Sequence, residues 1–222
     1  DPGVAVVLPL DDETAAYALP GVDGAHVTLA SLGRLGALPM GAVALDVARS
    51  VVARWASQTP PLPARLSGMG RFHGAEGEGD AAYLSVDAPG LSAARDALCR
   101  MLREAGLPVA ASHGFTPHAT LAYLPADAPT PDAPCALPLA LTLDAAAVWC
   151  GADRGTTAAL TGDGDPTTMA DKRKTRRSPA APAEAPATTP ADVVTLRGDS
   201  AEITCRETAA VGQKTRNQIA RF

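Results

Sequence analysis

The chain has 222 residues, which is enough for one domain with a substantial core and a small second module, but too short for several full domains. Hydrophobic residues make up 46% of the sequence and aromatic residues only 4%, so we expect a core of small aliphatic side chains. The formal net charge of -5 excludes broad binding to duplex DNA, because that mode of binding needs a basic face.

The first half of the sequence predicts two strands followed by a helix. The apolar run 4–10 is bounded by Pro-Gly and by acidic residues, which is typical of a buried strand, and a second strand is expected at 25–32. A helix is expected at 39–55, because its apolar residues recur at helical spacing and Pro39 suits a first helical turn.

The second half predicts more strands around one further helix. Strands are expected at 64–72 and 82–86, then a helix from Pro89 to Gly106. Three more strands are expected, at 117–124, 139–149 and 156–160. This mixed order is too irregular for a wound parallel sheet and indicates an α+β domain over residues 1–162.

Composition changes after this domain. Residues 1–162 contain nine arginines, no lysine and sixteen acidic residues, whereas residues 163–222 contain ten basic and eight acidic residues. We expect 163–191 to be a disordered Pro/Ala-rich linker with a basic run, and 192–222 to be the truncated start of another module. Because residue 1 is Asp and not Met, we expect the chain to be a fragment or a trimmed product.

The cysteines and the first apolar run indicate the cellular compartment of the protein. The four cysteines include no C-x-x-C pair, which argues against structural zinc and against a disulfide framework. The apolar run 4–10 is too short to span a membrane and lacks the basic flank of a signal peptide. We therefore expect a cytoplasmic protein without a membrane partner.

The same four-residue pattern occurs twice, ninety-two positions apart, as His26-Val27-Thr28-Leu29 and His118-Ala119-Thr120-Leu121. Each copy lies in an expected strand, where alternate side chains share a face, so His26 and Thr28 project together, as do His118 and Thr120. A single copy would indicate little, because a histidine beside a hydroxyl is usually structural. Two copies in matched contexts favour a site, and they suggest an internal duplication.

The two pairs suit phosphodiester chemistry. Imidazole titrates near neutral pH, so one histidine can take a proton while the other donates one to the departing oxygen. The two hydroxyls can hydrogen-bond the non-bridging phosphate oxygens, where charge accumulates. Such a reaction needs no metal and no cofactor.

The paired motifs, the proline before the second histidine in Phe115-Thr116-Pro117-His118, and the element order resemble the 2H phosphoesterase superfamily, which includes 2'-5' RNA ligase-like proteins and cyclic phosphodiesterases. The resemblance covers residues 4 to about 161. It implies a two-lobed, pseudo-duplicated fold in which antiparallel sheets flank a central cleft, with helices outside. It also implies 2',3'-cyclic phosphate or 2'-5' linked nucleotide substrates, His26 and His118 as acid and base, and Thr28 and Thr120 as phosphate ligands.

Several other residues are candidates for binding the substrate at this site. Many members of the superfamily have an arginine soon after the second motif, but Ala122 and Tyr123 follow it here. The substrate would then be bound differently, or another arginine would bind it. The candidates are Arg34, Arg71 and Arg154. Among the aromatics, Trp149 is expected to pack in the core. Phe115 and Tyr123 are candidates to stack a nucleobase, with core packing as an equal alternative. His73 is expected to be a surface residue, and His113 is expected in the loop before the second motif.

Two alternatives to a cyclic nucleotide phosphodiesterase acting on a small nucleotide or an RNA end remain open. The first is an accessory, non-catalytic domain of a phage structural or capsid-maturation polypeptide, whose C-terminal tail contacts virion partners. By its composition and its trailing segment, the chain resembles actinobacterial phage proteins of that kind. The second is an anti-defence enzyme that degrades cyclic oligonucleotide signals.

Overall fold

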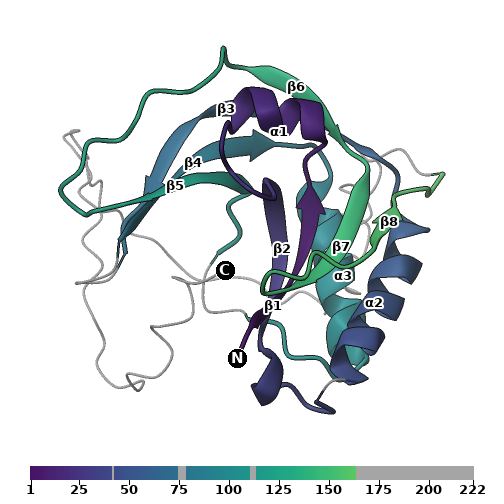
Figure 1. Cartoon of the computed structure of the whole chain (residues 1–222). Helices are drawn as coiled ribbons and strands as arrows, with labels where there is room; N and C mark the ends of the chain where they lie inside the picture. Colours follow the sequence, from purple (N-terminus) through teal and green to yellow (C-terminus); the bar gives the residue numbers. More distant parts are fainter. Residues whose placement is uncertain (42, 75–78, 111–113, 164–222) are drawn as a thin grey trace, which may run out of the picture.

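The computed structural model describes residues 1–163, apart from residue 42 and the segments 75–78 and 111–113. Residues 164–222, which hold most of the expected linker and the whole of the expected second module, lie outside the described part, as does His113. The described residues form eight strands, three α-helices and a 3-10 helix (Figure 1). Their bounds are β1 Gly3–Pro9, α1 Asp12–Ala18, β2 His26–Arg34, η1 Leu35–Ala37, α2 Val43–Ala56, β3 Leu62–Phe72, β4 Asp80–Asp87, α3 Leu91–Glu104, β5 His118–Leu124, β6 Leu139–Leu143, β7 Ala145–Cys150 and β8 Thr157–Ala159.

The eight described strands form one curled sheet in the order β6-β3-β4-β5-β2-β1-β7-β8, and neighbouring strands pair antiparallel. The two middle strands, β2 and β5, are joined in the described structure at one registered pair, Val27 with Ala119. Four strands therefore lie on each side of this joint as two lobes (Figure 1). The predicted α+β class with antiparallel strands is confirmed.

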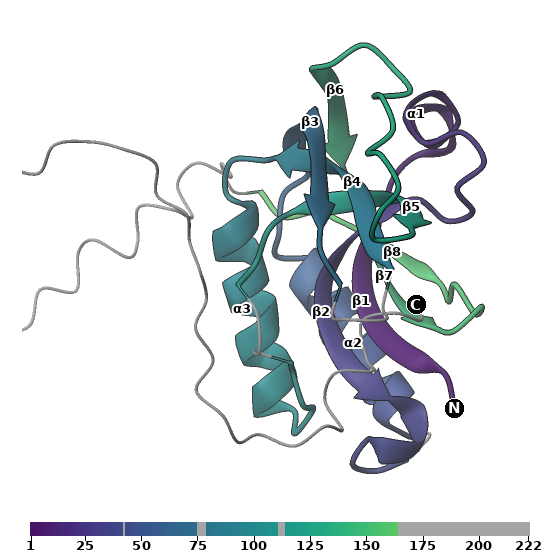
Figure 2. The same ribbon diagram turned by 90° about the vertical axis from the view of Figure 1, so that its left-hand side faces the viewer.

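The core lies between the sheet and the helices α2 and α3. Val4, Val6 and Leu8 of β1 alternate with residues on the opposite face and are fully buried beside Val27 and Leu29 of β2. The helices lie side by side on this face of the sheet (Figure 2), and the Trp55 indole N–H of α2 donates to the Ala94 carbonyl of α3 at 3.0 Å. Side chains on the other face of β2 and β5 point away from the helices.

That other face has an apolar floor in the lobe that contains β1. Ala5, Val7, Ala147 and Trp149 are buried in a small cluster of their own, separate from the main core. Val7 is registered with Thr28, so this cluster lies beside the first motif. The two faces of the lobe thus differ: one carries the core, and the other carries polar groups beside a small apolar cluster.

Two expectations about the elements were wrong or incomplete. The expected strand 139–149 is divided at Asp144 into β6 and β7, which pair with β3 and β1 in different lobes. Helix α1 was not expected, although its sequence held a signal: the Asp11 carboxylate caps it by accepting from the Thr14 amide at 2.8 Å, and acidic residues occupy its first turn.

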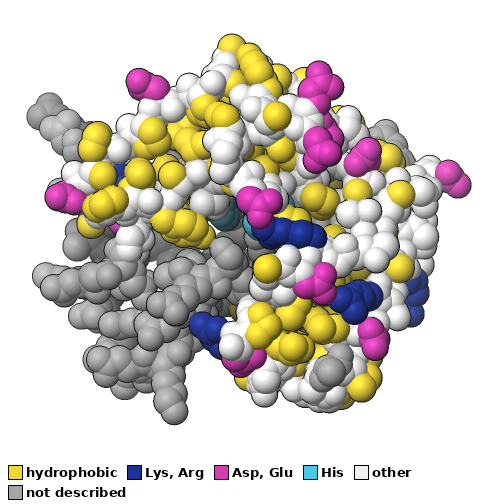
Figure 3. Space-filling model, in the orientation of Figure 1, with side chains coloured by type: hydrophobic (Ala, Val, Ile, Leu, Met, Phe, Trp, Pro, Cys, Tyr) yellow, Lys and Arg dark blue, Asp and Glu magenta, His cyan; other side chains and the backbone are white. Residues whose placement is uncertain are grey.

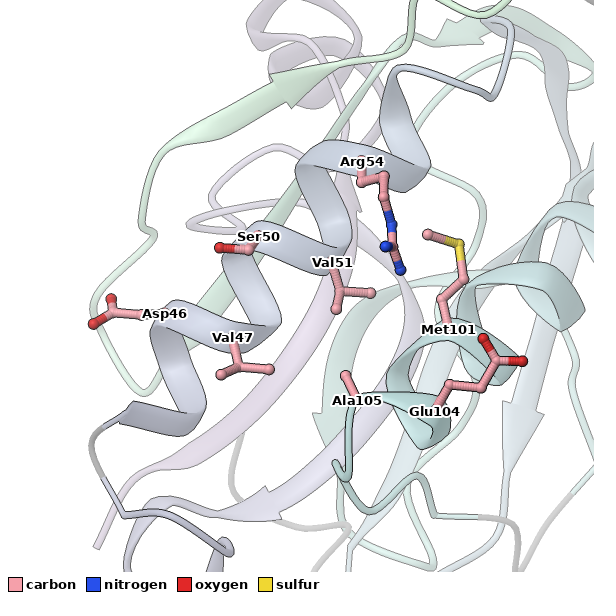
Figure 4. A pocket seen from close by; sticks show the side chains of 8 residues that line it. All are labelled: Asp46, Val47, Ser50, Val51, Arg54, Met101, Glu104 and Ala105. Carbon is pink, nitrogen blue, oxygen red and sulfur yellow. The ribbon is translucent and has the colours of Figure 1, made fainter.

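The outer surface of the helical layer has a groove between α2 and α3. Its volume is about 630 Å³, and it is lined by Val47, Val51, Met101 and Ala105 with charged residues at its rim (Figure 4). The groove lies on the helical side of the sheet, away from the face that carries the two motifs. Among the described helices, none is long and apolar enough to cross a membrane.

Candidate active site

The strand pair β2–β5 brings the two motifs together. Val27 and Ala119 are registered partners and both are fully buried on the core side. Continuing this antiparallel register by one residue in each direction sets His26 opposite Thr120 and Thr28 opposite His118. All four polar side chains therefore share the face away from the helices, although the motifs lie ninety-two positions apart in the sequence.

The two histidine rings are held in the same way. Nδ1 of His26 lies 2.7 Å from the carbonyl oxygen of Gly24, and Nδ1 of His118 lies 2.7 Å from that of Thr116. A carbonyl can only accept a hydrogen bond, so in both rings Nδ1 carries the proton and Nε2 is left for chemistry. In each motif the acceptor lies two residues before the histidine, so the local geometry is repeated along with the sequence pattern.

His26 lies in the more enclosed surroundings. Its ring meets the edge of Trp149 with centroids 4.5 Å apart. The Arg154 guanidinium lies over the same indole at 4.2 Å and pairs with the Asp23 carboxylate at 3.0 Å. Burial lowers the pKa of His26 below 6.5, the Gly24 carbonyl opposes this, and the charges of Arg154 and His118 add to the lowering. The neutral form of His26 is therefore favoured.

His118 lies instead against an aromatic cluster. Its ring meets the edges of Phe72 and Tyr83 with centroids 4.9 and 5.2 Å apart, and these two rings stack on each other at 4.2 Å. Tyr83 and Thr120 are registered partners, as are Ser85 and His118, so the cluster lies on the motif face. A Cβ at position 70 of β3 would overlap the Tyr83 ring, so Gly70 leaves space for this ring to lie over β3.

A β-bulge turns Tyr123 to the motif face. The register between β4 and β5 shifts between Ala82 and Tyr83, so that Tyr123 faces Ala81 and lies on the same side as Thr120. Its side chain is 55% exposed, and burial of the remainder raises the pKa of its hydroxyl. Tyr123 thus has a largely exposed ring on the motif face.

Phe115, the other predicted stacking residue, lies differently. It packs against the main core, and the Arg95 guanidinium covers one face of its ring at 4.4 Å from the centroid. Arg95 also donates to the Leu29 carbonyl at 2.7 Å, which ties α3 to β2. In the described structure the aromatic side chains in contact with His118 are Phe72 and Tyr83, which the sequence did not single out.

The three arginines considered as substrate-binding residues lie in different parts of the structure. Arg34 donates to the Asp1 backbone carbonyl at 2.6 Å. Arg71 is bound to Asp80 at 2.6 Å and to carbonyls of the loop after β5. Of these three, Arg154 lies beside a motif histidine, because it shares the Trp149 ring with His26.

The face that carries the histidines is open to solvent. Figure 3 shows histidine side chains recessed near its middle, next to a basic side chain. A hollow of about 480 Å³ next to Trp149 is lined by residues that include Asp12, Gly24, Trp149 and Arg154, and neither motif histidine is among its lining residues. Within the described residues, no group of three or more His, Cys, Asp and Glu side chains could hold a metal ion, so no ligand set is assigned.

Two histidines anchored through Nδ1, with a threonine beside each, on one face between two four-stranded lobes, are the arrangement of a 2H phosphoesterase. The chain belongs to the 2'-5' RNA ligase superfamily, whose sequence profile matches residues 13–154. The family predicted from the motifs is therefore confirmed. Comparison with curated proteins gives no match.

Solved structures share the fold at low sequence identity. The protein TT0787 of Thermus thermophilus is 20% identical, with a TM-score of 0.54 over 73% of this chain and 100% of that chain. A phosphoesterase structure is 18% identical, with a TM-score of 0.51 over 72% of this chain and 95% of that chain. E. coli LigT complexed with 3'-AMP is 18% identical, with a TM-score of 0.50 over 71% and 93%. These likenesses confirm the two-lobed fold.

Proposed function

We propose that the chain hydrolyses 2',3'-cyclic phosphate or 2'-5' linked nucleotides, with His26 as general base and His118 as general acid. The observation that carries this proposal is the repeated anchoring of the two imidazoles, each through Nδ1 to the carbonyl two residues before it. Both rings then present Nε2 from one face of the sheet. The lowered pKa of His26 supports its assignment as the base, because a base must be unprotonated at the working pH.

The reaction is a hydrolysis in which Nε2 of His26 takes a proton from water while the water oxygen bonds to phosphorus. The bond from phosphorus to the 2' or 3' oxygen breaks, and Nε2 of His118 gives its proton to that oxygen. Thr28 and Thr120 hydrogen-bond the non-bridging oxygens as negative charge grows on them. Diagonal neighbours on one face of an antiparallel pair lie roughly 7–8 Å apart, which leaves room for a phosphate between the two rings.

The test is turnover by wild type and by two single variants, followed by phosphorus NMR. His26→Ala and His118→Ala are each expected to lower kcat by roughly 10² to 10⁴, as for loss of one acid or base partner. Nucleoside 2',3'-cyclic phosphates, 2'-5' linked dinucleotides and cyclic di- and trinucleotides are assayed side by side, because the site chemistry suits all of them. Arg100→Gln serves as control, since this side chain is exposed on α3.

Two outcomes would contradict the proposal. Equal rates in wild type and both histidine variants would show that these side chains do not carry the reaction. A wild type inert toward every phosphodiester in the panel, together with full-length chain in purified virions, would favour an accessory role in a particle.

A further inference from the structure

The end of the β3–β4 hairpin has two different faces. Phe72 lies on the motif face, where it stacks on Tyr83 and meets His118. Its sequence neighbours Arg71 and His73 both contact Asp80 at the start of β4. Arg71 precedes Phe72 within β3, and neighbouring side chains of a strand project to opposite faces, so the Arg71–Asp80 ion pair lies behind the aromatic contacts.

Asp80 is the centre of the ionic contacts. Its side chain is 2% exposed, and its Oδ2 accepts from Arg71 Nε at 2.6 Å and from His73 Nδ1 at 2.8 Å. Its Oδ1 accepts from the Gly74 amide at 3.0 Å. One carboxylate thus binds the residues on both sides of Phe72, so the backbone at Phe72 is fixed from behind.

Arg71 extends these contacts to the loop after β5. Its side chain is 13% exposed, and its terminal nitrogens donate to the carbonyls of Pro125 at 2.9 Å, Ala126 at 3.1 Å and Ala128. Tyr123 lies two residues before Pro125, on the motif face. The Asp80–Arg71 pair therefore fixes Phe72 from one strand and Tyr123 from another.

The aromatic side chains in front of this pair form what we call the aromatic wall, made of Phe72, Tyr83 and Tyr123. Phe72 is 37% exposed and Tyr123 is 55% exposed, so both rings have surface open to a ligand. A nucleobase can stack on any such ring, because stacking needs only a π-face. Phe72 and Tyr83 of the wall contact His118, so a base stacked beside them would belong to the nucleotide bound at this histidine.

We propose that Asp80 and Arg71 are positioning residues that hold the aromatic wall in place to bind the nucleobase of the substrate beside His118. The inference rests on the proposed function, since it takes the ligand to be a nucleotide. Neither residue touches the reacting atoms. Their effect on the reaction passes through the position of Phe72 and Tyr123.

The experiment compares substrates with and without a base. Asp80→Asn keeps the shape of the side chain but removes the charge that Arg71 and His73 bind. The substrates are a nucleoside 2',3'-cyclic phosphate and glycerol 1,2-cyclic phosphate, which has the same reacting ring but no base. Asp87→Asn is the matched control, because Arg65–Asp87 is an ion pair between the same two strands at 2.6 Å, away from the aromatic wall.

Loss of one stacked base lowers affinity by roughly 5- to 150-fold, so a displaced wall should raise KM for the nucleotide by roughly fivefold or more. We expect Asp80→Asn to raise KM for the nucleotide more than it lowers kcat, and to leave KM for glycerol cyclic phosphate unchanged. Asp87→Asn should change neither. In a Phe72→Leu, Tyr123→Leu background, Asp80→Asn should have little further effect on KM, because the rings through which Asp80 acts are already absent.

A purely structural role for Asp80 would overturn the proposal. Its signs are equal losses for both substrates, equal effects of Asp80→Asn and Asp87→Asn, or an undiminished effect in the Phe72→Leu, Tyr123→Leu background. If Asp80→Asn does not fold, Arg71→Lys decides, because lysine keeps the charge but cannot bridge Asp80 and several carbonyls at once. The same selective rise in KM is then required.

Binding measurements separate this inference from the proposed function. Calorimetric titration of wild type and Asp80→Asn with a 3'-nucleotide and with inorganic phosphate requires no turnover. If wild type hydrolyses nothing yet binds the 3'-nucleotide through Asp80, the proposed function fails and the positioning role stands. If wild type hydrolyses cyclic phosphates while Asp80→Asn binds the 3'-nucleotide normally and turns over both cyclic phosphates normally, the positioning role fails alone.

Discussion

The two motif histidines share a backbone anchor but differ in what surrounds their rings. His26 is enclosed by Trp149 and Arg154, whereas His118 lies against Phe72 and Tyr83. An enclosed imidazole near a positive charge is easier to keep neutral. The division of roles that we propose for these two identical residues therefore follows from their neighbours and not from the motif itself.

The pH dependence of turnover is expected to report the pKa of His26. The base is active when neutral, so kcat/KM should rise with pH and reach half its limit below pH 6.5, because burial and the neighbouring charges lower this pKa. Arg154→Gln removes one of those charges, so the rise should move to higher pH. Histidine proton NMR titration checks the same shift, with Arg100→Gln as the control. A rise that moves to lower pH in Arg154→Gln would contradict this account.

Gly24 determines how closely Arg154 and Trp149 approach the first motif. A Cβ there would lie 2.7 Å from Arg154 Cζ and 3.0 Å from the Trp149 ring, at a φ of +65°. Gly24→Ala should therefore displace both side chains and lower kcat, and it should also destabilise the fold by about 1–2 kcal/mol from the left-handed backbone.

Gly21→Ala is the matched control for this prediction. Gly21 has a φ of +79° but no atom within 4 Å of its Cβ position, so it carries the same backbone cost without the contact. Thermal unfolding should show similar losses for both variants. Equal kcat in the two would show that the contacts of Arg154 and Trp149 do not matter for turnover.

At the residue scale the sequence predicted that His26 and Thr28 share a face and that His118 and Thr120 share a face, because alternation along a strand depends only on local sequence. The pairing of β2 with β5 puts the two pairs on the same face. The aromatic wall could not be predicted in the same way. Phe72 and Tyr83 reach His118 through the pairing of β3, β4 and β5, and Tyr123 turns to the motif face through a bulge. Pairing and bulges depend on contacts between distant segments, and no local pattern records them.

At the scale of the elements, the strands and the two long helices were predicted close to their observed positions. The segment 139–149 shows the limit of that approach. Its residues are suited to a strand throughout, yet Asp144 divides it between β6 and β7, which lie in different lobes. The two halves pair with different strands, β3 and β1, so a periodic pattern within the segment could not reveal the division.

The joint between β2 and β5 sets the spacing of the two motifs. Ala119 is fully buried between Val27 and Leu84, its registered partners. Ala119→Val adds volume at this point, which should destabilise the fold by about 1–3 kcal/mol. It should also push β2 and β5 apart, so kcat should fall further than the loss of stability explains.

Ala82→Val provides the comparison for this prediction. Ala82 is also fully buried on the core side, but its partner on β5 is Ala122, beyond the bulge. Both variants are expected to lose similar stability in thermal unfolding, while kcat measured well below the transition should fall in Ala119→Val alone. A parallel fall in both would mean that general loosening, and not motif spacing, limits the rate.

At the scale of the whole molecule, the two lobes share one core. Leu62, Leu84 and Leu143 of one lobe belong to the same buried cluster as Val6 and Leu8 of the other. The lobes are thus joined by this shared core, although β2 and β5 meet at a single registered pair. The resemblance to 2H phosphoesterases predicted this two-lobed arrangement; the small aliphatic composition predicted only the kind of core.

The C-terminal end of the described chain completes that core. Leu160 is buried, and the amides of Thr161 and Gly162 donate to the carbonyls of Ala56 at 3.1 Å and Thr59 at 3.0 Å at the end of α2. A chain that ends after Asp163 keeps all of these contacts. We therefore expect it to retain the melting temperature of the main transition and the kcat of the full chain.

A chain that ends after Gly155 should behave differently, because it lacks β8, Leu160 and both hydrogen bonds. Removal of the Leu160 side chain alone, as Leu160→Ala in the full chain, should cost about 2–5 kcal/mol, and the longer truncation should cost more. Calorimetric unfolding and kcat of the three proteins check this order. If the chain that ends after Asp163 lost activity while it remained folded, residues beyond 163 would have to contribute to the site, and the domain boundary proposed from composition would be wrong.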